Sequence, residues 1–241
     1  MCDSCGCALP AWNPARVYTP STQADTVSVL KQLLAGNDDQ AQHNRHHFDA
    51  HGVLAVNLMS SPGSGKTALL EATIDAFRGK YRIGVIEGDL ETENDAVRIR
   101  ARGAPARQIT TGTACHLDAA MVHEALHDFP LHDLDLLFIE NVGNLVCPAS
   151  FYLGQHCNVV LLSVTEGDDK PAKYPVMFRA ADLLLLTKSD LLEVLDDFDP
   201  NRAEVHLRQL ASAAPVFPLS ARKSLGMQRW LDWLGDRMEQ R

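Results

Sequence analysis

The sequence lacks the features of several protein classes. No apolar run is long enough to cross a membrane, and the longest lie around Leu134–Ile139, Val159–Val164 and Leu183–Leu186. There is no basic stripe, and the formal net charge of −9 disfavours binding to nucleic-acid phosphates or anionic lipid. The amino terminus has neither the basic start nor the apolar run of a secretory signal. We expect a cytoplasmic protein with neither a nucleic-acid nor a membrane partner.

The chain also lacks the spread of cysteines that a disulfide scaffold would need. Three of its six cysteines, Cys2, Cys5 and Cys7, fall at the amino terminus, and the rest are scattered. In a reducing compartment this clustering favours metal or redox chemistry over structural bridges. Three prolines between Ala8 and Thr22 predict a linker after the cluster.

With 241 residues, the chain is long enough for one well-buried α/β domain with room for a short appendage. A polar helix is predicted from about Asp25 to Asp49, with an apolar stripe at Val29, Leu33 and Leu34 and a break at Gly36–Asn37. Beyond it, apolar strands are predicted at 53–60, 82–86, 107–109, 134–140, 158–164, 182–187 and 216–220. Helices are predicted at 66–77, 93–102, 117–127, 202–210 and 225–238. This alternation predicts an α/β fold with a mostly parallel sheet covered by helices on both faces.

The segment S-S-P-G-S-G-K-T, residues 60–67, joins a predicted strand to a predicted helix. In the P-loop G-x-x-x-x-G-K-[ST], backbone N–H groups surround phosphates, the lysine reaches the β- and γ-phosphates and the hydroxyl binds Mg²⁺. Ser60 replaces the first glycine, and a glycine-rich turn with a chance lysine is the alternative. The predicted phosphate-binding residues are Ser61, Gly63, Ser64, Gly65, Lys66, Thr67 and Ala68.

The segment T-K-S-D, residues 187–190, follows a predicted strand and resembles the guanine-recognition motif N-K-x-D of GTPases. The Asp190 carboxylate would accept hydrogen bonds from two guanine donors that adenine lacks, and the Lys188 stem would lie over the base. Thr187 replaces the usual asparagine, and a helix start capped by Ser189 or Asp190 is the alternative.

The segment S-A-R, residues 220–222, resembles the S-A-x segment that closes a guanine pocket, through Ser220 and Ala221. Together with T-K-S-D, in the correct order behind a P-loop, it favours GTP over ATP.

Two acidic residues are candidates for catalysis beside Lys66. Glu140 lies in F-I-E-N-V-G, in the place of the D-x-x-G element that senses the γ-phosphate, where an aspartate is usual. Asp89 is the other carboxylate that would hold Mg²⁺, with Thr67, or orient water; a solvated loop acid or helix cap is its alternative. No glutamine follows Gly143 to position water and no arginine finger is identifiable, so slow hydrolysis is expected.

These segments together resemble HypB, the family of hydrogenase nickel-incorporation GTPases within the HypB/UreG group of P-loop proteins. The match covers almost the whole chain from Asn44 onward. It rests on S-S-P-G-S-G-K-T, G-D-L-E-T-x-N-D-A-x-R-I-R, T-G-T-A-C-H-L-D-A, F-I-E-N-V-G-N-L-V-C-P-A, S-V-T-E-G-D-D-K-P-x-K-Y-P and the terminal M-C-x-x-C-G-C. UreG, which serves urease, is not expected to carry the terminal cysteines.

Three closely spaced thiolates at Cys2, Cys5 and Cys7 would wrap one ion, with Gly6 giving the backbone freedom. A fourth donor from the terminal amine or a backbone amide would favour square-planar Ni²⁺. A Cys2–Cys5 disulfide or an unstructured tail are the alternatives. The resemblance maps the family's high-affinity nickel site onto these three cysteines.

Residue chemistry alone does not favour a metal site at Cys115, His116 and Cys147, because buried cysteines are common. The resemblance maps the family's second site, for zinc or nickel, onto these three residues, at an interface between two GTP-bound copies. Cys147 lies seven residues beyond Glu140. Nucleotide state would therefore be able to reposition one metal ligand.

The resemblance implies a GTP-hydrolysing nickel metallochaperone that assists nickel insertion into a [NiFe]-hydrogenase precursor. Its expected cofactors are GTP/GDP, Mg²⁺, Ni²⁺ and Zn²⁺. Its expected partners are a second copy in the GTP state, the nickel chaperone HypA and the hydrogenase large-subunit precursor. A urease-type accessory GTPase and a nickel-storage protein with only a regulatory nucleotide domain are the alternatives. The expected organisation is a nickel-binding tail with its linker (1–24), a leading helix (25–52) and a G domain (53–241).

A group of four histidines and a pair of lysines each allow more than one interpretation. His43, His46, His47 and His51 are too few and too interrupted for a nickel-storing tract, so we interpret them as polar surface of the leading helix. A contact to nucleotide across a dimer or a solvated charged turn would equally explain the lysines in D-D-K-P-A-K, Lys170 and Lys173.

Overall fold

The computed structural model describes residues 23–241 except 90, 92 and 211, and it describes side chains from residue 34 onward. The predicted nickel ligands Cys2, Cys5 and Cys7 lie outside the described residues, as does the linker up to residue 22. The side chains of Val29 and Leu33 lie outside them too. Within the part described, no helix has the length and apolarity needed to span a membrane.

Seven parallel strands form a single sheet in the order β3-β2-β4-β1-β5-β6-β7. They are β1 (Leu54–Ser60), β2 (Ile83–Asp89), β3 (Ala106–Thr110), β4 (Leu136–Glu140), β5 (Cys157–Ser163), β6 (Leu183–Thr187) and β7 (Val216–Pro218). Strands β1, β4 and β6 are buried throughout, as expected of parallel strands covered on both faces. The predicted fold class is confirmed.

Eight α-helices are described in residues 23–241. They are α1 (Gln23–Ala50), α2 (Lys66–Phe77), α3 (Asn94–Ala101), α4 (Ala119–Leu126), α5 (Lys170–Lys173), α6 (Pro175–Arg179), α7 (Pro200–Gln209) and α8 (Met227–Glu239). Three 3₁₀ turns, η1 (Leu131–Asp133), η2 (Cys147–Ser150) and η3 (Ser189–Leu191), accompany them. The sequence did not predict α5 and α6, because four or five residues with a proline in the first turn show no helical periodicity.

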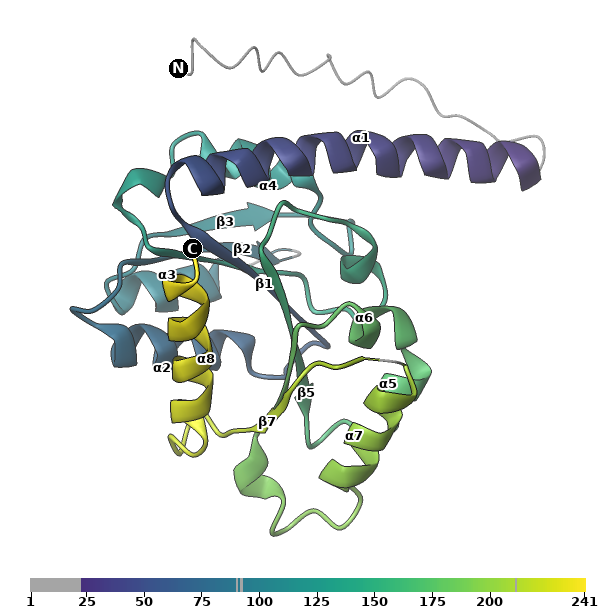
Figure 1. The fold of residues 1–241 in the computed structure, drawn as a ribbon, viewed down its shortest axis with the longest axis vertical. Helices are drawn as coiled ribbons and strands as arrows, with labels where there is room; N and C mark the ends of the chain where they lie inside the picture. The colour runs from purple at the N-terminus through teal and green to yellow at the C-terminus, as the bar shows by residue number, and fades with distance from the viewer. Residues whose placement is uncertain (1–22, 90, 92, 211) are drawn as a thin grey trace.

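The two faces of β1 pack against different helices, because successive side chains of a strand point to opposite faces. Leu54, Val56 and Leu58 belong to the core beneath α2, α3 and α8. Val53 and Ala55 belong to the core beneath α1 and α4, and the neighbouring core on the same face contains α6 and α7. Figure 1 shows the resulting three layers, with α1 running along the outside of the sheet.

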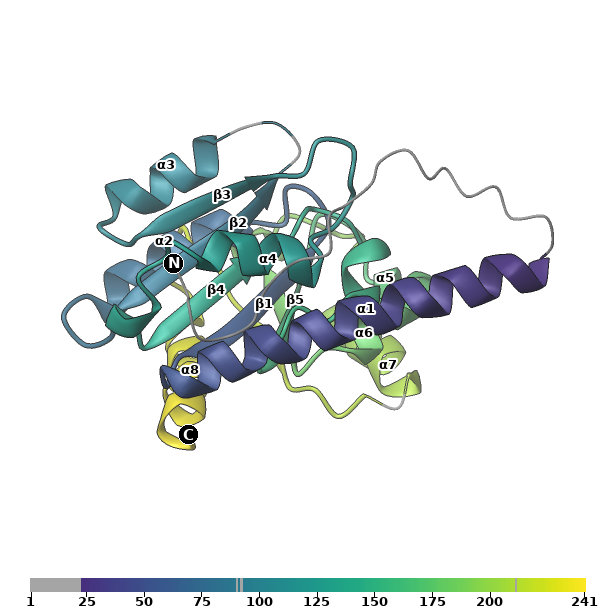
Figure 2. The same ribbon diagram turned by 90° about the horizontal axis from the view of Figure 1, so that it is seen from above.

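Helix α1 continues through Gly36 and Asn37, so the predicted break is wrong. Two hydrogen bonds of the Asn37 side chain explain this: the amide nitrogen donates to Tyr152 O at 2.8 Å, and the oxygen accepts from Ala119 N, at the start of α4, at 2.9 Å. Farther along, Gly154 approaches α1 so closely that a Cβ there would lie 2.5 Å from Ala41 O. These contacts hold α1 beside α4, as Figure 2 shows.

Candidate nucleotide pocket and metal clusters

A pocket of about 690 Å³ lies beyond the carboxyl ends of the parallel strands. This is the edge at which parallel α/β sheets bind ligands. The pocket is lined by residues 62–69 of the P-loop and α2, by Asp89 and Glu140, and by Lys188, Asp190, Ser220 and Ala221. The structure therefore brings the three predicted nucleotide motifs together. Ser61 does not line the pocket; its hydroxyl lies 2.8 Å from that of Ser64.

The phosphate loop has the backbone that its sequence predicts. Gly63 and Gly65 have φ angles of 74° and 95°, which residues with a Cβ rarely adopt. The irregular residue Ser60 has a specific contact: Lys66 Nζ donates to its hydroxyl at 3.0 Å. Both side chains are buried. The hydroxyl of Ser60 thus holds the lysine within the loop.

Thr187 connects the T-K-S-D segment to the phosphate loop. Its hydroxyl, buried at the end of β6, donates to Ser64 O at 2.7 Å. The following residue, Lys188, has a φ of 57° and begins η3 without a side-chain cap. The capping alternative for Ser189 and Asp190 is therefore wrong. Among the described residues, no hydrogen bond or ion pair engages the Asp190 carboxylate, which borders the pocket.

Glu140 lies buried at the end of β4, beside the phosphate loop. Its Oε1 accepts from Thr67 Oγ1 at 3.1 Å and lies 4.0 Å from Lys66 Nζ, whereas its Oε2 has no hydrogen-bond partner among the described residues. Carboxylate oxygens of Glu87, Asp95 and Glu140 lie within 4.8 Å of one another. Mg²⁺ prefers oxygen ligands of this kind. Two buried oxygens of this donor set, Glu87 Oε2 and Glu140 Oε2, have no hydrogen-bond partner among the described residues, so the set fits the predicted magnesium ion.

Glu87, Asp95 and Arg98 also line the pocket, and none of the three was predicted from the sequence as a site residue. A usable signal was present for Glu87, because a glutamate within the otherwise apolar strand β2 is unusual. Asp95 and Arg98 lie on α3, and only the packing of that helix places them at the pocket.

Burial changes the protonation of the two buried glutamates. Desolvation, reinforced by the nearby Glu140 carboxylate, raises the pKa of Glu87 to about 8. Desolvation also raises the pKa of Glu140 to about 7, with Lys66 acting in the opposite direction. Both groups bind protons more tightly when folded than when unfolded, where their ordinary pKa is 4.5. Their contribution to stability is therefore complete below pH 4.5 and is lost as the pH rises toward 8.

Replacing Glu87 by glutamine is expected to flatten the pH dependence of thermal unfolding. With magnesium chelated and no nucleotide, Glu87→Gln should raise the melting temperature at about pH 8 by roughly 4 °C or more, since each kcal/mol corresponds to about 2–4 °C in a chain of this size. Calorimetry between about pH 5 and 8 measures the effect. Glu124→Gln, at an exposed position on α4, should leave the slope unchanged. An equal slope in Glu87→Gln and the parent chain would contradict the assignment.

Cys115, His116 and Cys147, called here the cysteine cluster, lie together away from the phosphate loop. Their ligand atoms lie within 4.8 Å of one another; Cys115 Sγ is 2.8 Å from Cys147 Sγ and 3.8 Å from His116 Nδ1. Both cysteines are free thiols, and the His116 ring stacks on Phe151 at 3.8 Å. The hydrogen bond with Cys115, followed by burial, raises the pKa of Cys147. Two thiols and an imidazole suit Zn²⁺ or Ni²⁺.

Asn141 and Gly143 join the pocket to the cysteine cluster. The buried Asn141 side chain accepts from Leu117 N at 3.1 Å, directly after His116, and donates to Asn57 on β1 at 3.3 Å. Gly143 lies so close to the phosphate loop that a Cβ would be 2.8 Å from Pro62 Cα. Both chain segments that carry the cluster are therefore anchored near β1 and its loop.

The structure separates the four histidines in and directly after α1 into two pairs. His46 and His51 are exposed, in agreement with the predicted polar surface. His43 and His47 are half-buried and face His123 on α4, so the surface interpretation is wrong for them. The sequence did not reveal this because the partner lies on another helix.

The two lysines of D-D-K-P-A-K begin and end the short helix α5. Lys173 forms an ion pair with Asp169 at 2.5 Å, and Lys170 Nζ lies 5.8 Å from the Tyr174 ring centre. These contacts agree with a charged turn, and a contact across a dimer stays a prediction.

Comparison with known proteins identifies the relatives of this chain. Residues 54–218 match the CobW/HypB/UreG nucleotide-binding domain. Hydrogenase maturation factor HypB of Azotobacter chroococcum mcd 1 is 51% identical, over 92% of this chain and 72% of that protein. Hydrogenase/urease maturation factor HypB of Helicobacter hepaticus is 42% identical, over 92% of each. The crystal structure of HypB from Helicobacter pylori in complex with nickel is 42% identical, with a TM-score of 0.81 over 85% of this chain and 96% of that one.

The resemblance inferred from the motifs is thus confirmed in sequence and in fold. The chain belongs to the HypB family of hydrogenase maturation factors, within the CobW/HypB/UreG group of nucleotide-binding proteins.

Proposed function

We propose that this chain is a GTP-hydrolysing nickel metallochaperone that assists nickel insertion into a [NiFe]-hydrogenase precursor. One observation supports the proposal: the segment from Glu140 to Cys147 borders the pocket at one end and carries, at the other, a thiol that lies beside Cys115 and His116 and could bind a soft metal ion. A relative of the chain, HypB from H. pylori, has been crystallised with nickel.

Within the pocket, each predicted nucleotide contact has a physical role. Backbone N–H groups around Gly63 and Gly65 would face the phosphates, and Lys66 would leave Ser60 to stabilise the charge that develops on them. The unpartnered Asp190 carboxylate would accept from the ring N–H and amino group of guanine. Ser220 and Ala221 border the same space and would close over the base.

Thr67, Glu140 and Asp89 are the residues that would hold magnesium. The ion would neutralise phosphate charge. Glu140 keeps the Thr67 hydroxyl oriented at the start of α2 through a 3.1 Å hydrogen bond. The residue directly after Gly143 is Asn144 and not a glutamine that could position water, and slow intrinsic turnover remains our expectation.

Nickel is the cargo in this proposal. Cys2, Cys5 and Cys7 would bind it tightly at the amino terminus, and the cysteine cluster would hold nickel or zinc in a manner that depends on the nucleotide. Pairing of two GTP-bound copies at the cluster, delivery with HypA and transfer to the hydrogenase large-subunit precursor complete the proposed cycle. The half-buried ligands of the cluster fit such an interface, because a partner would cover them.

The Cys115→Ala, Cys147→Ala double variant tests the proposed metal site. In a chain whose three amino-terminal cysteines are also replaced, nickel and zinc affinity should fall by on the order of 100-fold or more, since both thiolate ligands are lost. Titrations with GDP, with a GTP analogue and without nucleotide measure both the affinity and its dependence on nucleotide. Cys157→Ala, at a buried cysteine beside Arg237, is the matched control. Affinities that are the same in all three nucleotide states would refute the coupling.

Delivery to urease is the second candidate, because the H. hepaticus relative is a hydrogenase/urease maturation factor. Deleting the gene in its own host and assaying both enzymes, with and without added nickel, separates the two targets. Loss of urease activity alone would refute hydrogenase maturation as the function.

A further inference from the structure

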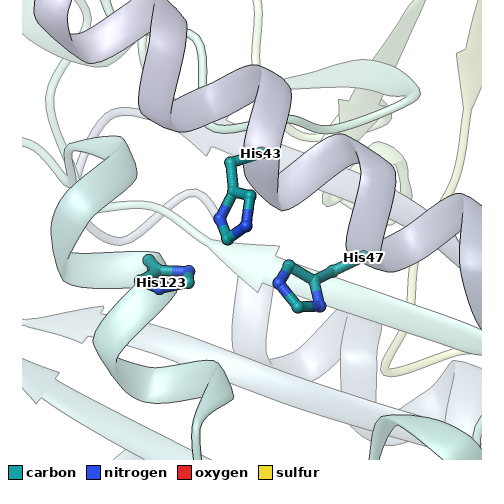
Figure 3. A group of neighbouring side chains, drawn as sticks. All are labelled: His43, His47 and His123. Carbon is teal, nitrogen blue, oxygen red and sulfur yellow. The ribbon is translucent and has the colours of Figure 1, made fainter. Parts of the chain in front are cut away.

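Three histidines meet between α1 and α4, and none of them belongs to a motif described above. Figure 3 shows His43 and His47, four residues apart on α1, pointing toward His123 on α4. One ring nitrogen of each lies within 4.8 Å of the others. The ring centres are 4.6 Å apart for His43 and His47, 5.0 Å for His43 and His123, and 5.9 Å for His47 and His123. We call this group the histidine cluster.

A buried asparagine fixes the orientation of His123. Asn44, with no exposed surface, donates from its amide nitrogen to Ala119 O at 2.8 Å and to Leu153 O at 3.2 Å. Since carbonyls only accept, the remaining Asn44 oxygen faces His123 Nδ1, at 3.2 Å. His123 Nδ1 must therefore carry the proton, and its Nε2 is left with a lone pair. Metal-binding histidines are characteristically oriented by such a hydrogen bond from the other ring nitrogen.

The surroundings favour neutral rings, which is the form that binds metals. Burial, together with the neighbouring imidazoles of His43, His127 and His47, lowers the pKa of His123 to about 4. Burial and the nearby histidines also lower the pKa of His47. His127, exposed one turn along α4, places its Nε2 3.3 Å from that of His123 and supplies a fourth nitrogen at the rim.

We propose that the histidine cluster is a binding site for a divalent transition-metal ion of the kind that imidazole prefers, Zn²⁺ or Ni²⁺, separate from both cysteine sites. With a metal–nitrogen distance of about 2.0–2.1 Å, tetrahedral ligands lie roughly 3.4 Å apart. The nitrogens within 4.8 Å reach that spacing by side-chain rotation alone. A bound ion would fasten α1 to α4, the helix that begins three residues after His116.

The test uses the full chain with both cysteine sites removed, so that neither of them competes with the histidine cluster for the metal. The background carries Ser in place of Cys2, Cys5, Cys7, Cys115 and Cys147, and Ala in place of His116. Competition titration against a chromophoric chelator, with zinc and separately with nickel, should show one ion per chain. The His43→Gln, His47→Gln variant should bind at least roughly 30-fold more weakly, because two ligands are lost. The His46→Gln, His51→Gln variant, changed at one exposed position on α1 and one directly after it, should bind like the background.

Thermal unfolding supplies an independent readout. The metal should raise the melting temperature of the background and of the His46, His51 control, because it binds only the folded site. The metal should leave the melting temperature of the His43→Gln, His47→Gln variant unchanged. If the double variant is poorly folded without metal, single His43→Gln replaces it in both measurements.

Two results would overturn the proposal. The first is a background protein that binds neither zinc nor nickel more tightly than the His43, His47 variant. The second is an equal loss of affinity in the His46, His51 control, which would show adsorption by surface histidines. Neither result affects the proposed cysteine site, which the background lacks.

Discussion

Replacing Lys66 by alanine is expected to lower GTP hydrolysis by a factor of roughly 10²–10³, the effect of removing one preorganised charge-stabilising donor, about 2.7–4 kcal/mol. The Lys66 ammonium is the cation that the phosphate loop places within its own concavity, held at 3.0 Å by the Ser60 hydroxyl. Among the described residues that line the pocket, the one other lysine is Lys188, which belongs to the T-K-S-D segment and not to the phosphate loop. Phosphate release under saturating GTP and magnesium measures the loss.

The control must separate chemistry from folding, because Lys66 also lies 4.0 Å from the buried Glu140 carboxylate. Lys80→Ala, at an exposed lysine following α2, should hydrolyse GTP like the parent chain. Circular dichroism and the melting temperature of Lys66→Ala should show a folded protein. A folded variant with undiminished turnover would exclude Lys66 from the phosphate site. In the cell, hydrogenase maturation that persists without hydrolysis would instead favour the nickel-storage alternative.

Asp190→Asn is expected to change which base the pocket accepts. Guanine presents two donors to the carboxylate, and each hydrogen bond to a charged group is worth about 1.5–3 kcal/mol, so GTP affinity should fall on the order of 100-fold or more. An asparagine amide can instead donate to the carbonyl that xanthine carries in place of the guanine amino group. Xanthosine triphosphate should therefore bind the variant more tightly than GTP does. Displacement of a fluorescent GDP analogue measures both affinities.

Two comparisons make this test specific. Asp197→Asn, an exposed aspartate in the loop after η3, should keep the preference for GTP. ATP should compete poorly with GTP in the parent chain, since adenine lacks the donor pair. Equal displacement by ATP and GTP in the parent would remove Asp190 from base recognition, while leaving the phosphate loop unaffected.

The parallel sheet was predictable because most of its strands are short apolar runs that alternate with helices; β3, A-R-Q-I-T, is the exception. The predicted α2, residues 66–77, matches the observed bounds, since glycine before it and the phosphate loop fix its start. Interactions distant in sequence explain the errors. Gly36 favours a helix break locally, but hydrogen bonds of Asn37 to residues 119 and 152 hold α1 continuous.

The site residues also differ in whether a local sequence pattern or a contact distant in sequence brings them to the site. Lys66, Asp190 and Ser220 stand in contiguous motifs and could be located from spacing alone. Glu87 lies just outside the recognised segments, and Asp95 lies within G-D-L-E-T-x-N-D-A-x-R-I-R without a role that its spacing reveals. Both residues reach the pocket through strand order and the packing of α3. His123 is paired with His43 only by the docking of α1 on α4, and a single sequence does not encode that pairing in any local pattern.

The contact between Gly143 and Pro62 has a mechanical consequence. Because position 143 has no side chain, the backbones of the phosphate loop and of the loop that leads from β4 to Cys147 lie against each other directly. A side chain between them would be able to rotate and absorb a small displacement, whereas two backbones in contact cannot. Movement of the loop's outer edge must therefore push the neighbouring segment by a similar amount. At residue 143 the two segments therefore have no room to move independently of each other.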